Sequence, residues 1–134
     1  MGIAIPNVFV SSERVDDSHV MGLISRLRQE GYTVSHSPRN PADGEDPRWR
    51  AWYESGCRAE VAQADVFLIG VTRGWDCSTW MCHEAEEARL SGRIRRRCYY
   101  NPAHIAVKEN MAWSYLNERL PDDLGEAVAS LKKD

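Results

Sequence analysis

One short segment constrains the fold of this chain more than any other. Residues Val66 to Val71 read Val-Phe-Leu-Ile-Gly-Val, a run that is almost wholly apolar. A strand that is apolar on both faces is typical of the centre of a parallel sheet covered by helices on both sides, whereas a strand with one solvated face alternates. The segment therefore predicts a central strand in a layered α/β domain.

Segments with strand and helix patterns alternate along the rest of the chain. Further strands are predicted at Asn7–Ser11, Tyr32–His36 and about Arg97–Tyr100, the last stopped by Asn101-Pro102. A helix is predicted after Asp16 or Asp17, because Val20, Leu23, Ile24 and Leu27 follow helical spacing and Gly31 supplies a left-handed stop. Other helices are predicted at Arg48–Ala64, opened by Asp46-Pro47, at Trp80–Leu90, from about Ala103, and at Pro121–Lys132.

This alternation implies right-handed crossovers and a parallel sheet with helices on both faces. We expect an α/β, three-layer, flavodoxin-like fold, with four strands in the order 2-1-3-4 or five in the order 2-1-3-4-5. Ile105–Val107 and Trp113–Tyr115 are the candidates for the fifth strand. The length of 134 residues fits one domain over residues 1–134.

Composition narrows the functional classes. The formal charge of −3 offers no basic surface to a nucleic acid, although Arg93, Arg95, Arg96 and Arg97 form a local run that fits either a solvated edge or a contact with phosphates. No apolar run reaches the roughly 20 residues needed to span a bilayer, and the start lacks the pattern of a signal peptide. Four irregularly spaced cysteines fit reduced thiols rather than disulfides or a zinc site, so we expect a cytoplasmic protein without membrane contact.

The strand order places a candidate site. The first and third strands are neighbours whose connections leave toward opposite faces, so a ligand crevice is expected outside their carboxyl ends. That edge brings Ser11 and Ser12 toward the segment Thr72–Glu84. Trp80 and Glu84 are four residues apart and share one face of the predicted helix. The alternative is structural: carboxylates in the first turns stabilise a helix dipole, and a tryptophan there can belong to the core.

The order and spacing of these motifs resemble the TIR (Toll/interleukin-1 receptor) domain family. The family signature Ser-x-Trp-x-x-x-Glu is matched by Ser78, Trp80 and Glu84, after an apolar strand preceded by Ala64-Asp65. Val8–Ser12 is similar to the opening strand and small-residue loop of the family, and Ser37–Glu45 falls where the family has its mobile loop. The resemblance covers roughly residues 7 to 100. The sequence departs from the family where Met81 follows Trp80, with cysteine displaced to Cys82, and where the first loop lacks the Tyr-Ser pair.

The resemblance implies hydrolysis or cyclisation of NAD at the nicotinamide–ribose bond. Glu84 would be the catalytic residue, and the substrate-binding residues would be Ser11, Ser12, Trp75, Ser78 and Trp80. The loop residues Pro38, Arg39, Asp43 and Gly44 would complete the site or mediate assembly. NAD would be the substrate, with no cofactor and no metal. The resemblance also implies a homo-oligomer, an effector protein as a further partner, and a place in bacterial defence or signalling.

Two alternatives remain open at this point. Nucleoside deoxyribosyltransferases and nucleotide N-hydrolases have a similar small α/β layout with a glutamate after the third strand. Ala88 fits their pattern, whereas Glu86 replaces a glycine and their opening Gly-Pro is absent. A non-catalytic TIR-type assembly module is the other alternative, and a solvent-facing Glu84 would favour it.

Overall fold

The computed structural model describes residues 6–12, 17–36, 58–72, 79–105 and 118–132. Within these ranges five strands form one sheet in the order β2-β1-β3-β4-β5, and every neighbouring pair is parallel. The strands are β1 (Asn7–Ser12), β2 (Thr33–His36), β3 (Val66–Gly70), β4 (Arg96–Tyr100) and β5 (Glu118–Arg119). The predicted flavodoxin-like order is confirmed in its five-stranded form.

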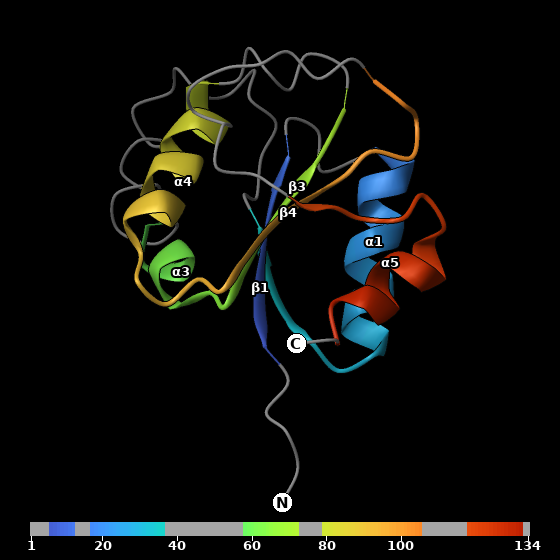
Figure 1. The fold of residues 1–134 in the computed structure, drawn as a ribbon, viewed down its shortest axis with the longest axis horizontal. Coiled ribbons are helices and arrows are strands. Elements are labelled where there is room, and N and C mark those ends of the chain that lie inside the picture. The colour runs from blue at the N-terminus through green and yellow to red at the C-terminus, as the bar shows by residue number, and fades with distance from the viewer. Residues whose placement is uncertain (1–5, 13–16, 37–57, 73–78, 106–117, 133–134) are drawn as a thin grey trace, which may run out of the picture.

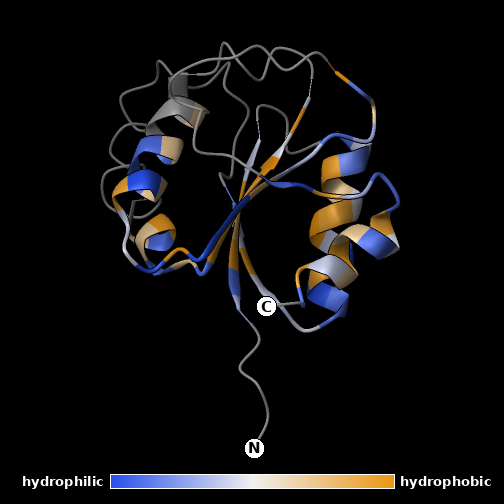
Figure 2. Cartoon of the chain, in the orientation of Figure 1, coloured by the Kyte–Doolittle hydropathy of each residue, from blue (hydrophilic) through white to orange (hydrophobic). Residues whose placement is uncertain are grey.

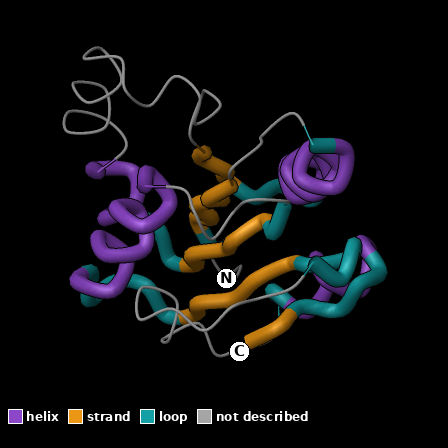
Figure 3. Tube along the Cα trace, turned by 90° about the horizontal axis from the view of Figure 1, so that it is seen from above, coloured by secondary structure: helices purple, strands orange, loops and turns teal. Residues whose placement is uncertain are grey.

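Helices cover both faces of the sheet and complete three layers (Figure 1 and Figure 3). The helices α1 (Ser18–Gln29) and α5 (Leu124–Ser130) lie on one side, which we call the α1 face. The helices α3 (Arg58–Gln63) and α4 (Thr79–Leu90) lie on the other side, which we call the α4 face. None of the helices in the described ranges is both long enough and apolar enough to pass through a membrane.

The apolar run of β3 fills a core on each side of the sheet. Val66 and Leu68 belong to the core on the α1 face, and Phe67 and Ile69 to the core on the α4 face. Phe67 stacks on Phe9 of β1, with ring centroids 6.1 Å apart and ring planes inclined by 2°. In Figure 2 hydrophobic residues are prominent in the central strands, whereas the helices carry both hydrophobic and hydrophilic residues. Each such side chain contributes roughly 1.5–3 kcal/mol when fully buried, which explains why this strand is central.

The first helix has the ends that its sequence predicts. Asp17 is the N-cap, and its carboxylate accepts hydrogen bonds from the backbone N–H groups of His19 and Val20. At the other end Gly31 has a φ of 94°. The N–H of Gly31 donates to the carbonyl of Arg28 and that of Tyr32 to the carbonyl of Leu27, which is the Schellman arrangement. The four predicted apolar positions of α1 are all buried.

The fifth strand is not where either sequence candidate placed it. It is Glu118–Arg119, two polar residues paired with β4 through Cys98↔Glu118 and Tyr99↔Arg119. Ile105 lies in an irregular segment, and the rest of both candidates lies outside the described residues. Tertiary contacts hold this strand: Arg96 makes a two-pronged ion pair with Glu118, and its Nη1 donates to the carbonyl of Ser130 in α5 at 2.7 Å.

Two predicted helices also need correction. Pro102 and Ala103 form a turn, and His104 at φ 55° and Ile105 are irregular, so the helix predicted from about Ala103 is absent over residues 103–105 and the rest of it lies outside the described residues. The last helix is shorter than Pro121–Lys132, because Asp123 caps it and α5 ends at Ser130. Of the helix predicted at Arg48–Ala64, residues 58–63 form α3 and the preceding part lies outside the described residues.

Candidate active site

The carboxyl ends of β1 and β3 lie side by side, where the strand order reverses. Ser11 pairs with Ile69 and Ser12 with Gly70 in the parallel register. From this edge the chain proceeds after β1 to α1 on one face, and after β3 to α4 on the other. A ligand site in an open α/β sheet is expected at such a switch point.

A serine and a glutamate from these two segments meet at this edge. The hydroxyl of Ser11 donates a hydrogen bond of 2.7 Å to Oε1 of Glu84, although the two residues are 73 positions apart in the chain. Side chains alternate along β1, so Ser11 points to the α4 face like Phe9, and α4 presents Glu84 to it. Ser11 is 0% exposed and Glu84 1% exposed. The contact between these two residues is therefore enclosed by protein.

A buried carboxylate is a costly group to place in a core. Removing a carboxylate from water is unfavourable unless hydrogen bonds replace the lost hydration, and the Ser11 hydroxyl is one such donor. Glu86 is two residues along the same helix but is exposed and pairs with Arg89, whose Nε donates to Oε2 at 3.0 Å. That hydrogen bond to Arg89 lowers the pKa of Glu86. The first turn of α4 has no acidic residue, so the helix-dipole alternative explains neither glutamate: Glu86 pairs with Arg89 on the exposed side of the helix, whereas Glu84 is buried at the sheet edge.

Ser12 lies at the same edge on the opposite face. A Cβ built on Gly70 would lie 3.6 Å from the Cβ of Ser12 and 2.9 Å from Cγ2 of Val20 in α1, so Ser12 points toward α1. Ser12 is 3% exposed. The structure therefore brings Ser11, but not Ser12, against Glu84.

Several predicted site residues cannot be placed with the same detail. Trp80 belongs to α4, one turn before Glu84, and its side chain lies outside the described part of the structure. The other predicted site residues that lie outside the described residues are Trp75, Ser78, Pro38, Arg39, Asp43 and Gly44.

The sequence prediction missed a residue at the end of β3. Thr72 is 2% exposed, and its hydroxyl has no hydrogen-bond partner among the described residues. A buried hydroxyl without a partner costs about 1–3 kcal/mol, so each such group calls for an explanation, such as a bound ligand or water that supplies the partner. The signal in the sequence was a threonine directly after the apolar run, at the start of the segment Thr72–Glu84 that the strand order places opposite Ser11.

The fold and this edge define a class: a three-layer α/β domain with an enclosed carboxylate at the switch point of its sheet. Comparison of the sequence with protein-family models found no match, and comparison with curated proteins found none either.

Proposed function

We propose that this protein is an N-glycosidase that cleaves the bond between nicotinamide and ribose in NAD, with Glu84 as the catalytic carboxylate. One observation carries the proposal: Glu84 is buried at the carboxyl edge of β1 and β3 and receives a hydrogen bond from Ser11. Buried ionisable groups in a ligand-binding position are candidates for catalysis, because their environment is costly for the fold. The motif formed by Ser78, Trp80 and Glu84, which resembles the TIR signature, supports the same proposal.

The reaction suits a site with one well-held carboxylate. Nicotinamide leaves from a positively charged pyridinium, so the departing base needs no proton from a general acid. Positive charge develops on the ribose as the bond breaks, and a fixed negative charge beside it stabilises that transition state. Water or a hydroxyl of the substrate then attacks the anomeric carbon, which gives ADP-ribose or a cyclic product.

The enclosure of Glu84 adds one step to this mechanism. A carboxylate that is 1% exposed contacts a substrate only after neighbouring groups move, so catalysis requires an opening of the site. We propose that assembly into a homo-oligomer in the cytoplasm accompanies this opening. Light scattering during size-exclusion chromatography, with and without NAD, would detect the assembly.

The test compares two glutamates of the same helix. Purified protein is incubated with NAD, then with nucleoside and deoxynucleoside monophosphates, and released base is measured by chromatography. We expect nicotinamide from NAD, loss of release in Glu84→Gln, and release near the wild-type rate in Glu86→Gln. Glutamine keeps an oxygen that accepts the Ser11 hydrogen bond, so the first variant removes the charge and preserves the contact.

The other outcomes point to the alternatives. Release of base from the monophosphates but not from NAD would favour the deoxyribosyltransferase-like reading. Retained turnover in Glu84→Gln would refute the catalytic role. Absence of release from every substrate, with oligomers present, would favour an assembly module.

A further inference from the structure

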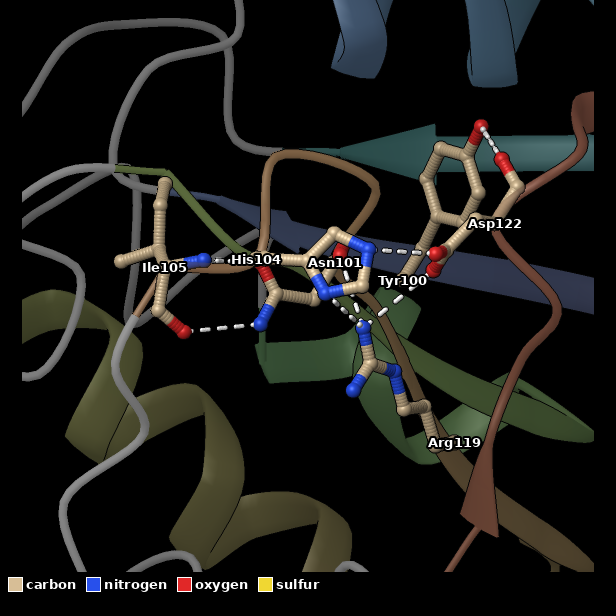
Figure 4. Close-up of polar contacts among 6 residues, drawn as sticks. All are labelled: Tyr100, Asn101, His104, Ile105, Arg119 and Asp122. Atoms are coloured by element: carbon tan, nitrogen blue, oxygen red, sulfur yellow. Dashed lines mark hydrogen bonds and ion pairs between the residues drawn. The ribbon is translucent and has the colours of Figure 1, made fainter.

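A second polar cluster lies at the carboxyl edge of the sheet, after β4 and β5 (Figure 4). Arg119 is at its centre: its Nη2 donates to the carbonyl of Asn101 at 3.2 Å and to Oδ1 of Asp122 at 3.2 Å. The other carboxylate oxygen of Asp122 is 2.6 Å from Nε2 of His104. The Nδ1 atom of His104 lies 3.4 Å from Nη2 of Arg119. We call Asn101, His104, Arg119 and Asp122 the β4–β5 cluster.

Side-chain to backbone hydrogen bonds hold the segment after β4 that carries Asn101 and His104. Asn101 is 2% exposed. Its Nδ2 donates to the backbone carbonyl of Ile105 at 2.8 Å, and its Oδ1 accepts from the backbone N–H of Ile105 at 2.9 Å. These two bonds bracket His104, which has a positive φ of 55°. A non-glycine residue in that region is strained by about 1–3 kcal/mol, and such strain is concentrated at ligand sites and switches.

The sheet register aligns Arg119 with the Ser11–Glu84 pair. Ser11 is the partner of Ile69, Ile69 of Tyr99, and Tyr99 of Arg119, so the four residues form one row across four strands. Ile69 and Tyr99 belong to or pack against the core on the α4 face, and residues paired in a parallel sheet point the same way. Arg119 therefore starts from the same face as Ser11, three strand spacings away, or about 14 Å. Its guanidinium group reaches back over the end of β4, where it bonds the Asn101 carbonyl.

The guanidinium group keeps donors for a ligand. Its contacts with the described residues all involve Nη2, whereas Nε and Nη1 have no partner among those residues. The Arg119 side chain as a whole is 41% exposed. Nε and Nη1 point in different directions, so each can donate a single charge-assisted hydrogen bond to a phosphate oxygen, and an orientation fixed in advance reduces the entropy lost on binding. Because Asp122 offsets the charge of Arg119, recognition depends on these directed donors more than on net charge.

We propose that Arg119 binds a phosphate of the nucleotide substrate, which makes the site selective for phosphate-bearing nucleotides over nucleosides. The phosphates of a dinucleotide lie several bonds from the anomeric carbon, so a substrate that has that carbon at Glu84 and lies over the carboxyl edge of the sheet can place a phosphate near Arg119. Asp122 and the Asn101 carbonyl are positioning groups that hold Nη2. This inference rests on the proposed function for the location of the reacting bond.

The test uses two substrates that share the reacting bond and differ in phosphate. Binding of NAD and of nicotinamide riboside to the Glu84→Gln protein is measured by calorimetry, and turnover of both is measured in the protein with Glu84 intact. We expect Arg119→Gln to weaken NAD binding and raise its KM by about tenfold or more, because charge-assisted hydrogen bonds are lost. Nicotinamide riboside should bind and turn over within about twofold of the parent, since it has no phosphate.

Two further variants control for charge and folding. Arg95→Gln removes an exposed arginine just before the amino end of β4, at the opposite edge of the sheet. This variant should leave the binding and turnover of both substrates unchanged. Arg119→Lys keeps the charge without the directed guanidinium donors, so its affinity for NAD should lie between those of the parent and Arg119→Gln. Thermal unfolding of each variant identifies any loss of fold.

The outcomes separate this inference from the proposed function. Two results would overturn phosphate binding while leaving the glycosidase proposal in place. One is that Arg119→Gln does not affect turnover of NAD, and the other is that it lowers turnover of NAD and nicotinamide riboside equally. Arg119-dependent binding of NAD without any turnover would support phosphate binding and refute the glycosidase. Failure of the Glu84→Gln protein to bind NAD more tightly than nicotinamide riboside would overturn the inference whatever the turnover.

Discussion

At the scale of single residues, the Ser11 hydroxyl supplies one hydrogen bond to the buried carboxylate of Glu84. The Ser11 hydroxyl has one proton, and it donates that proton to Oε1 of Glu84. Ser11→Ala leaves the carboxylate with one donor fewer, so we expect the free energy of unfolding to fall by about 1–3 kcal/mol. Urea denaturation measures this loss.

Turnover provides a second readout for the same variant. If Ser11 acts by orienting Glu84, Ser11→Ala should lower kcat for NAD by about tenfold, which corresponds to about 1.4 kcal/mol of transition-state stabilisation. Because Glu84→Gln is expected to abolish release, the positioning role is tested by separating kcat from KM, and the KM for NAD in Ser11→Ala should stay within about twofold of the wild type. A loss confined to KM would contradict the positioning role.

Thr72 is the opposite case, because its buried hydroxyl has no partner among the described residues. Thr72→Val replaces that hydroxyl with a methyl group of similar size. We expect the unliganded protein to be as stable as the wild type or more stable by about 1 kcal/mol, since a buried unpaired polar group disappears. The same variant should bind NAD more weakly, whereas Thr72→Ser should resemble the wild type in binding. A Thr72→Val protein that is destabilised by about 2 kcal/mol would show that the hydroxyl is bonded in the folded state.

Sequence reasoning reached one part of the site and missed another for identifiable reasons. The strand order alone places Ser11 near the segment that carries Glu84, and the contact between them agrees with that expectation. Ser12 was expected at the same site, but adjacent residues in a strand point to opposite faces. Arg119 could not be assigned because its strand consists of two polar residues and its row depends on the register of three strand pairs.

At the scale of elements, the packing of α1 against β3 depends on Gly70. A Cβ at this position would lie 2.9 Å from Cγ2 of Val20, which is 1% exposed in α1. Valine has a stiff χ1 in a helix, so the helix itself would have to shift. We expect Gly70→Ala to lower the free energy of unfolding by about 1–3 kcal/mol, measured in urea.

Gly92 offers the matched control for that measurement. An added Cβ there meets no atom within 4 Å, and the residue is exposed beyond the end of α4. Gly92→Ala should therefore stay within about 0.5 kcal/mol of the wild type. Equal effects of the two substitutions would mean that backbone freedom, rather than contact with α1, explains the role of Gly70.

Elements with a strong internal pattern were predictable, and those held by distant contacts were not. β3 and α1 follow from apolar runs and end signals within a few residues of the chain. β5 has no apolar pattern of its own, because pairing with β4 and the Arg96–Glu118 ion pair hold it in place. The bounds of α5 depend on the cap at Asp123. Arg119, four residues earlier, is exposed, and its role also depends on tertiary contacts.

At the scale of the whole molecule, Cys98 reports on the integrity of the core. It lies in β4, is 0% exposed, and packs in the core on the α1 face. Burial raises the pKa of its thiol from 9.0 to about 12, because the thiolate would be poorly solvated there. The thiolate is the reactive form, so at pH 8 Cys98 should react with a thiol reagent only when the molecule unfolds. Peptide mapping by mass spectrometry can follow this residue separately from Cys57, Cys77 and Cys82.

The same thiol makes the stability of the folded protein depend on alkaline pH. Since the folded pKa lies above the unfolded value, the neutral thiol stabilises the fold fully below pH 9, and this contribution is lost as the pH rises from 9 toward about 12. Wild-type stability should therefore fall more steeply than that of Cys98→Ala over this window, by up to about 1.4 kcal/mol per pH unit. Urea denaturation of both proteins between pH 8 and pH 10.5 measures the difference, and the comparison cancels the titration of tyrosines and lysines common to both. Parallel curves, or labelling of Cys98 at pH 8 faster than unfolding allows, would mean that the core opens locally at β4.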